Sequence, residues 1–289
     1  MVPQVLQVIT QVGIVVFIVG SMAAMGLGLT IPRIVEPLRD VRLVLGLLVA
    51  NFVVVPAAAI AAGRLLPMEP AASTAVILIG CAAGAPFLPK LTQLARGNVA
   101  LAVGGMVLLM VVTVLYAPIV VPLVIPGATV DAFQIARSLI VLMLIPLGIG
   151  LVVRARYPGL ADDWVGPAGQ ASTAGLLIGI SSAILVTWQD ILGAIGTWIF
   201  VGTALVLVTG LLAGWLAGWS RPTDRPLLGL ATAQRNIAAA LVVASSIGGD
   251  TLLYTLVGAL VIPIVLIVLA GEMGRRDASA AVAPPATAG

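Results

Sequence analysis

Long apolar runs, separated by short charged segments, constrain this chain more than any other feature of its sequence. A bilayer core of ~30 Å takes about 20 helical residues to cross. Nine segments reach that length, and we expect each of them to span a membrane as a helix. They are approximately residues 5–30, 43–63, 71–94, 99–125, 133–153, 169–188, 191–218, 226–247 and 252–269.

Charge is scarce along the whole chain. Only 9% of its 289 residues are charged and 61% are hydrophobic, whereas roughly a quarter of the residues in a soluble domain are charged. An ordinary soluble domain is therefore excluded. A disulfide scaffold is excluded because Cys81 is the only cysteine, and histidine chemistry because there is no histidine. We expect an all-α polytopic membrane protein of nine transmembrane helices.

The positions of the basic residues predict the orientation, since lysine and arginine accumulate in cytoplasmic loops. With the N-terminus outside, 11 of the 14 basic residues fall at inner ends or in inner loops. We therefore expect the cell (inner) membrane, with an outer N-terminus and a cytoplasmic C-terminus. The charges form no basic stripe, so no nucleic-acid partner is expected. The 11 residues are Arg33, Arg39, Arg42, Lys90, Arg96, Arg154, Arg156, Arg221, Arg225, Arg275 and Arg276.

The chain divides into one transporter-like domain, residues 1–274, and a low-complexity end, residues 275–289, which we expect to be a disordered cytoplasmic tail. Within the domain, an offset of 152 residues aligns Gly97–Val99 with Gly249–Thr251 and overlays spans two to four on spans seven to nine. A shift of five spans reverses the direction of the copies. Inverted repeats of this kind are typical of secondary transporters, which bind substrate near the midplane.

The middle span of each copy is interrupted at matching places. Span three carries Gly84, Pro86 and Pro89 within one short stretch, and prolines remove backbone donors from a helix. Span eight carries the polar run Gln234–Asn236 at membrane depth. Each interruption has a purely structural reading: span three is a kinked helix without function, and Arg235 of span eight reaches one membrane surface. The alternative for both is a polar site between the two interruptions.

These residues resemble the bile acid:sodium symporter family. The resemblance lies in Gly80–Gly84, Leu94–Asn98 and Gln234–Asn236, and it is supported by Asn51 with Pro56 and by Leu144–Gly148. It implies a panel of spans one, five and six, and a core of spans two to four and seven to nine. Spans three and eight would be discontinuous helices that cross in the core. It also implies alternating-access transport of a small organic anion, in contact with the lipid bilayer.

The chain departs from the sodium-coupled pattern of that family. Leu88–Pro89 stands where those members carry a Ser-Asn pair, and Ala231 stands where they carry a glutamate. Sodium prefers oxygen ligands with a carboxylate nearby, as other hard cations do, and no Asp or Glu lies inside any span. We expect transport, secondary active or facilitative, that is not coupled through the family's sodium sites. A conventional sodium-coupled symporter is the alternative, and the coupling ion stays unknown.

Arg235 is the residue that we expect to meet the carboxylate or sulfonate of the substrate, with Gln234 and Asn236 as hydrogen-bonding neighbours. Lys90 has a second reading as an ordinary inner-surface residue. The other candidates would face or shape the same site: Asn51, Gly84, Pro86 and Lys90.

Other classes of function fit less well. A channel or a receptor-like binding protein stays as an alternative, although the apolar fourth and ninth spans offer no continuous polar stripe. Arsenite efflux carriers share this fold class, but their Pro-Cys-Thr sequence is missing around Cys81. An enzyme is not expected, because Ser181–Ser182 and Ser245–Ser246 have no base within their spans. No metal or cofactor is expected, and no phosphate-binding loop is present.

Overall fold

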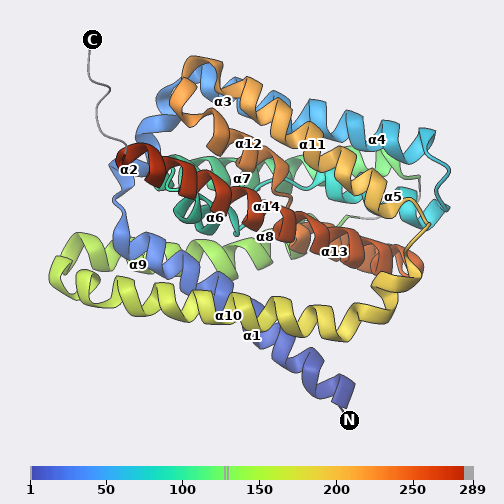
Figure 1. Ribbon diagram of the computed structural model, residues 1–289, viewed down its shortest axis with the longest axis horizontal. Coiled ribbons are helices and arrows are strands. Elements are labelled where there is room, and N and C mark those ends of the chain that lie inside the picture. The colour runs from blue at the N-terminus through green and yellow to red at the C-terminus, as the bar shows by residue number, and fades with distance from the viewer. Residues whose placement is uncertain (1, 127, 129, 283–289) are drawn as a thin grey trace.

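A computed structural model describes residues 2–126, 128 and 130–282 of the chain (Figure 1). All regular elements in this part of the chain are helical, which confirms the all-α fold. The first half forms α1 (Val2–Gly28), α2 (Ile31–Val35), a 3-10 turn (Glu36–Arg39), α3 (Val41–Val49), a π-helical turn (Ala50–Val54), α4 (Val55–Leu65), α5 (Pro70–Cys81), α6 (Leu88–Leu94) and α7 (Val99–Val124).

The second half continues in the same way. It forms α8 (Ala132–Leu139), a π-helical turn (Ile140–Leu144), α9 (Ile145–Arg156), α10 (Pro158–Gly193), α11 (Ile199–Ala217), two 3-10 turns (Gly218–Ser220 and Pro222–Asp224), α12 (Arg225–Ala233), α13 (Ile237–Ile247) and α14 (Asp250–Val282). Each π-helical turn lies just before a proline, Pro56 or Pro146, which lacks the N–H that a regular helix needs at that position.

Eight helical stretches in the described residues are long and apolar enough to cross a membrane, not nine. They are Gln4–Gly28, Val41–Leu65, Val99–Val124, Ala132–Arg156, Pro158–Gly193, Ile199–Ser220, Pro222–Ile247 and Asp250–Arg276. The segment expected at 71–94 is missing from this set because it is divided. Its first half, α5, has 12 residues, its second half, α6, has seven, and residues 82–87 between them are not helical. The stretch Pro222–Ile247 is also interrupted, at residues 234–236.

Side-chain caps define where several helices begin. Asp131 accepts a hydrogen bond from the Gln134 N–H at 3.0 Å at the start of α8, which satisfies one of the free N–H groups of the first turn. Asp40 caps α3 by accepting from the Leu43 N–H at 3.2 Å. This bond, together with Arg221, holds the pKa of Asp40 below its ordinary value. Loop carboxylates thus fix the entry of the chain into its helices.

Glycines let α1 approach α9 and α10 closely, which is typical of helix packing in membranes. A Cβ at Gly13 would lie 2.8 Å from the Gly179 nitrogen in α10, and a Cβ at Gly26 would lie 2.9 Å from the Gly150 Cα in α9. Figure 1 shows these three helices together along one side of the molecule. They form a layer in which the backbones are nearly in contact.

Small residues also join the helices of the other layer. A Cβ at Gly210 of α11 would lie 2.6 Å from the Ala233 Cα in α12, and a Cβ at Gly80 of α5 would lie 2.2 Å from the Ala59 Cβ in α4. The two interrupted segments therefore have close neighbours on both sides. Non-helical backbone at membrane depth is tolerated only where it is covered in this way.

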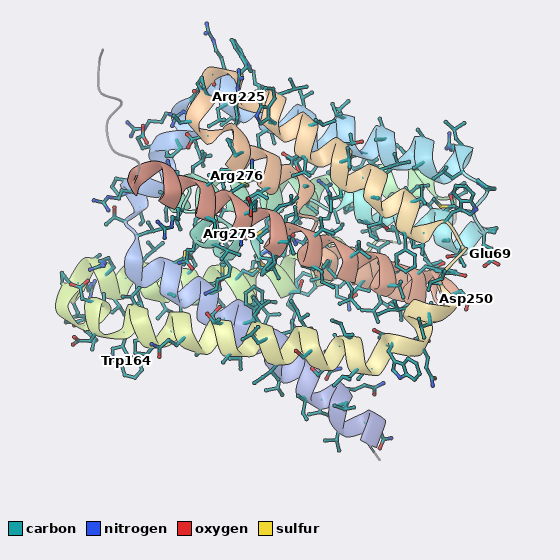
Figure 2. The ribbon with its side chains drawn as sticks, viewed as in Figure 1. Glu69, Trp164, Arg225, Asp250, Arg275 and Arg276 are labelled. Carbon is teal, nitrogen blue, oxygen red and sulfur yellow. The ribbon has the colours of Figure 1, made fainter. Side chains whose placement is uncertain are left out.

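Charged residues gather at both ends of the molecule. Arg225, Arg275 and Arg276 lie toward one end of the long axis, and Glu69 and Asp250 lie at the other (Figure 2). At the C-terminus, α14 continues to Val282. Residues 275–282, which were expected to be disordered, therefore belong to α14. The rest of the expected tail, residues 283–289, lies outside the described residues.

Candidate functional site

The two interruptions meet. Asn236, at the start of α13, donates its backbone N–H to the Ala82 oxygen at 2.9 Å and its Nδ2 to the Gly84 oxygen at 3.0 Å. Its Oδ1 accepts from the Ala239 N–H at 3.1 Å and so caps α13. One side chain thus binds the first interruption and starts the helix that follows the second.

Backbone geometry at the first interruption depends on Gly84. Its φ is +78°, a left-handed value that glycine adopts without strain. A Cβ at this position would lie 2.4 Å from the Met110 nitrogen in α7, so a larger residue does not fit. Thr113 of α7 accepts from the Ala83 N–H at 3.2 Å and donates to the Ala83 oxygen at 3.0 Å. The interrupted backbone is therefore satisfied by a neighbouring helix.

Arg235 lies at the crossing and is 1% exposed. Its Nε donates to the Ile79 oxygen at 3.2 Å, and its Nη1 donates to Asn51 Oδ1 at 2.9 Å and to the Thr232 oxygen at 3.1 Å. Its Nη2 donates to the backbone oxygen of Asn51 at 3.5 Å and to the backbone oxygen of Gly80 at 2.5 Å. A guanidinium has five N–H donors, and five oxygens lie within 3.5 Å of its nitrogens, the Asn51 backbone oxygen being the farthest.

Two of those acceptors belong to the last turn of α5. The C-terminal end of a helix carries partial negative charge, which favours a cation. Within the described residues, Arg235 forms no ion pair with a carboxylate. The site is therefore a ring of neutral oxygens around one buried positive charge, and that charge has no acidic counterpart.

Asn51 lies in the π-helical turn Ala50–Val54 and is fully buried. Its Nδ2 donates to the Leu47 oxygen at 3.0 Å and to Thr232 Oγ1 at 3.1 Å, while its Oδ1 accepts from Arg235. The wider turn places this amide against α12. Asn51 thus orients the arginine from a segment far away in the sequence.

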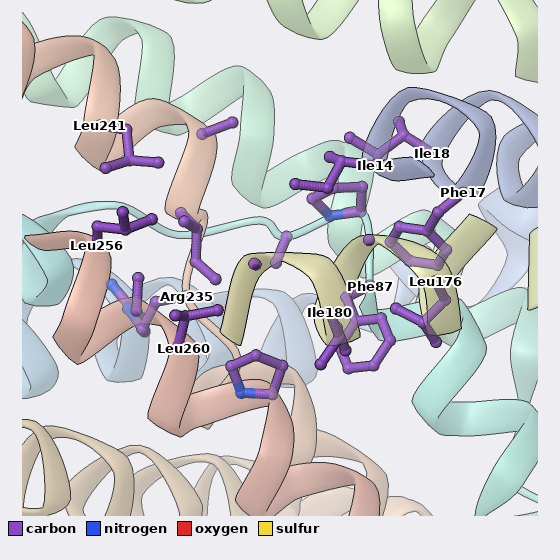
Figure 3. A pocket seen from close by; sticks show the side chains of 18 of the residues that line it. Ile14, Phe17, Ile18, Phe87, Leu176, Ile180, Arg235, Leu241, Leu256 and Leu260 are labelled. Carbon is purple, nitrogen blue, oxygen red and sulfur yellow. The ribbon is translucent and has the colours of Figure 1, made fainter. Parts of the chain in front are cut away.

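A cavity of about 230 Å³ lies beside the crossing (Figure 3). Pro86, Gln234 and Arg235 contribute to its wall, and almost all of the remaining surface is apolar. The apolar lining comes from α1, the first interruption, α10, α13 and α14, and includes Ile14, Phe17, Phe87, Leu176, Leu241, Leu256 and Leu260. Such a site suits a small ligand with an apolar body.

Lys90 lies outside this cavity. Its Nζ donates to Thr173 Oγ1 at 2.6 Å, and the side chain is half-buried between α6 and α10. The structure brings six of the seven residues expected from the sequence to the crossing and places Lys90 apart from them, at a contact between two helices. Three of the six, Pro86, Gln234 and Arg235, line the cavity, whereas Asn51, Gly84 and Asn236 lie at the crossing outside its lining. The six are Asn51, Gly84, Pro86, Gln234, Arg235 and Asn236.

Sequence reasoning missed Thr113, Thr232 and the apolar lining. Both threonines are isolated polar residues in apolar helices, a signal that was available. The lining residues carry no such signal, because apolar side chains in a cavity and apolar side chains toward lipid look alike in a sequence.

A model of the sodium bile acid symporter family matches residues 14–194, which is more than half of the chain. The matched part includes Asn51 and the first interruption, whereas the second interruption lies beyond it. None of the curated proteins compared with the chain matches it.

Proposed function

The chain belongs to the sodium bile acid symporter family, a family of transporters, and we propose that it carries a small organic anion across a membrane by alternating access. The observation that carries this proposal is the buried, uncompensated charge of Arg235 at the edge of an apolar cavity. A fixed charge in a low-dielectric site attracts an anion more strongly than it would in water.

Arg235 would act on the substrate through its charge and not through a direct hydrogen bond, because its five donors already have acceptors. This differs from the direct contact expected from the sequence. A substrate carboxylate would be attracted through space. The ring of oxygens would stay closed throughout transport.

The proposed architecture has nine crossings, with the divided segment α5–α6 as the third. Support for an inverted repeat comes from one hydrogen bond: Asn236 and Gly84 are 152 residues apart, which is the offset that aligns the two copies. In a pair of inverted copies, the equivalent positions nearest the pseudo-twofold axis lie side by side. The crossing would then lie on that axis.

Transport would proceed by movement of a core (α3–α7 and α11–α14) against a panel (α1 and α8–α10). The cavity lies between these two groups of helices. Bridging contacts include the Phe17 and Phe87 rings, with centroids 5.4 Å apart, and the bond from Lys90 to Thr173. Breaking such contacts would open the cavity on the side of α6.

We propose that the site of Arg235 holds no sodium ion. The guanidinium occupies a ring of five oxygen contacts of the kind that a hard cation prefers, and no carboxylate lies within that ring. The orientation proposed is an outer N-terminus, in keeping with the basic residues near the other end of the helices (Figure 2).

Solute counterflow tests the carrier function. Purified protein is reconstituted in liposomes loaded with an unlabelled organic acid, and transient accumulation of the labelled acid is measured. A carrier gives an overshoot above equilibrium, because exchange is faster than net loss. A channel gives simple equilibration and a receptor-like protein gives binding without uptake, and either result contradicts the proposal.

A further inference from the structure

Gln234 carries a buried oxygen that no group of the described protein pairs with. The residue is 2% exposed and contributes to the cavity wall, and its Oε1 has no hydrogen-bond partner. Its Nε2 donates to the Arg235 oxygen at 3.4 Å, which assigns the amide nitrogen to the backbone and leaves the oxygen unpaired. Buried acceptors of this kind are rare, and each calls for a physical reason.

The same cavity offers little else that is polar. Thr10 also contributes to its wall, but its hydroxyl is engaged with the Leu6 oxygen and Ser182 Oγ, both at 2.9 Å. The N–H groups of Arg235 already have acceptors within the protein. Gln234 Oε1 therefore lacks a hydrogen-bond donor, and it lies beside a positive charge and among apolar side chains.

We infer that Gln234 determines specificity, and that the substrate is a carboxylate with an apolar body and a hydroxyl close to the carboxylate. This inference rests on the proposed function for the anionic part. An ionised carboxylate is only an acceptor, so it cannot pair with Gln234 Oε1, and a separate donor on the ligand is required. Arg235 and Gln234 are adjacent in the chain, which keeps the two polar groups of the ligand close together.

Pairing involves a turn of the Gln234 side chain toward the cavity, because its oxygen is covered by neighbouring atoms. Such a turn is a change between staggered rotamers. It breaks the long Nε2 bond to the Arg235 oxygen, which keeps the Ile237 N–H as a donor at 3.1 Å, and it gives Gln234 Oε1 a partner. The hydroxylated ligand therefore binds more tightly than its analogue without the hydroxyl.

Matched pairs of acids test this inference. Binding to purified protein is measured by titration calorimetry for phenyllactate against 3-phenylpropionate, and for mandelate against phenylacetate. Each pair differs by one hydroxyl next to the carboxylate. The wild-type protein is expected to bind the hydroxylated member about tenfold more tightly, as a hydrogen bond to a buried acceptor predicts.

Gln234→Met removes the oxygen and keeps a similar volume. It is expected to bring the ratio of the two dissociation constants close to one. It should also leave the thermal midpoint unchanged or raise it, because it removes an unpaired buried acceptor. Thr10→Val is the matched control: it removes a polar group of the same wall that is already bonded, so the ratio should stay as in the wild type.

The outcomes separate the two proposals. If the wild type binds both members of each pair equally, or if Gln234→Met keeps the preference, the inference about Gln234 is wrong and the anion carrier stands. If neither member of any pair binds, the inferred ligand, a carboxylate with an apolar body and a nearby hydroxyl, is contradicted, whereas the anion carrier is judged by counterflow. A clear drop in the thermal midpoint of Gln234→Met would show that the protein holds the Gln234 amide in place, through Nε2 or Oε1, and would contradict its turn toward a ligand.

Discussion

Arg235 Nη1 lies 2.9 Å from Asn51 Oδ1, although the two residues are 184 positions apart in the chain. This contact joins the second interruption to the π-helical turn between α3 and α4. It also closes a ring of oxygens around a cation that belongs to the protein itself. A buried charge with five neutral acceptors explains how an arginine is kept at membrane depth without an acidic partner.

Removing that cation is expected to destabilise the crossing. Arg235→Ala leaves several buried oxygens without a donor, each at a cost of ~1–3 kcal/mol, so the thermal midpoint should fall strongly. Guanidinium ion at low millimolar concentration should restore part of the loss in this variant, because it fits the vacated ring. Arg137→Ala, at an exposed position of α8, is the control and should change stability little. An unchanged midpoint in Arg235→Ala would contradict the role of the ring.

A second variant cancels the charge of Arg235 by a neighbouring carboxylate and keeps the arginine in place, so that the effect of the charge on uptake can be measured. Asn51→Asp keeps the Oδ1 acceptor and adds a carboxylate next to Arg235, while it gives up the Nδ2 bond to the Leu47 oxygen and lets Thr232 Oγ1 donate in place of accepting. We expect the variant to fold and its anion uptake to fall on the order of tenfold or more, because the positive potential at the cavity is cancelled. The same substitution at Asn98, an exposed helix cap, should leave uptake unchanged, since aspartate caps a helix equally well. Equal uptake by both variants would rule out attraction by charge.

The first interruption is expected to tolerate no side chain at Gly84. Gly84→Ala places a Cβ 2.4 Å from the Met110 nitrogen at a φ of +78°, so the yield of folded protein should collapse. Gly148→Ala, in α9, meets nothing within 4 Å and should be neutral or stabilising by up to ~1 kcal/mol. Size-exclusion profiles and thermal unfolding compare the two. A well-folded Gly84→Ala variant would show that this backbone is not fixed as described.

Much of this arrangement could be predicted from the sequence. The apolar runs indicate the spans, and Pro86, Pro89 and the polar run at Gln234–Asn236 indicate both interruptions. The partners of Arg235 could not be predicted, because Ile79 and Gly80 contribute backbone oxygens, which every residue type has. The expected contact of Arg235 with a substrate stays a prediction, since the partners of this arginine within the protein leave no trace in the sequence.

The contact between Lys90 and Thr173 is expected to keep the side of α6 closed. Lys90→Met removes the 2.6 Å bond between α6 and α10, so the core separates from the panel more often. The single native cysteine, Cys81, is buried and lies outside the cavity lining, so the reporter is Leu176→Cys, on the cavity wall in α10, in a Cys81→Ser background. A small maleimide should label this reporter faster with Lys90→Met than without it. Thr173→Val should give the same increase, and equal labelling rates in all three proteins would contradict the role of this contact.

If a guanidinium of the protein takes the place of a bound cation, uptake should not depend on a sodium gradient. Uptake of a transported acid into proteoliposomes is compared under an inward sodium gradient and under an equal gradient of choline. We predict equal initial rates in wild-type protein and loss of uptake in Arg235→Ala. A steep rise in wild-type uptake with the sodium gradient, or full uptake by Arg235→Ala, would contradict this role of the guanidinium.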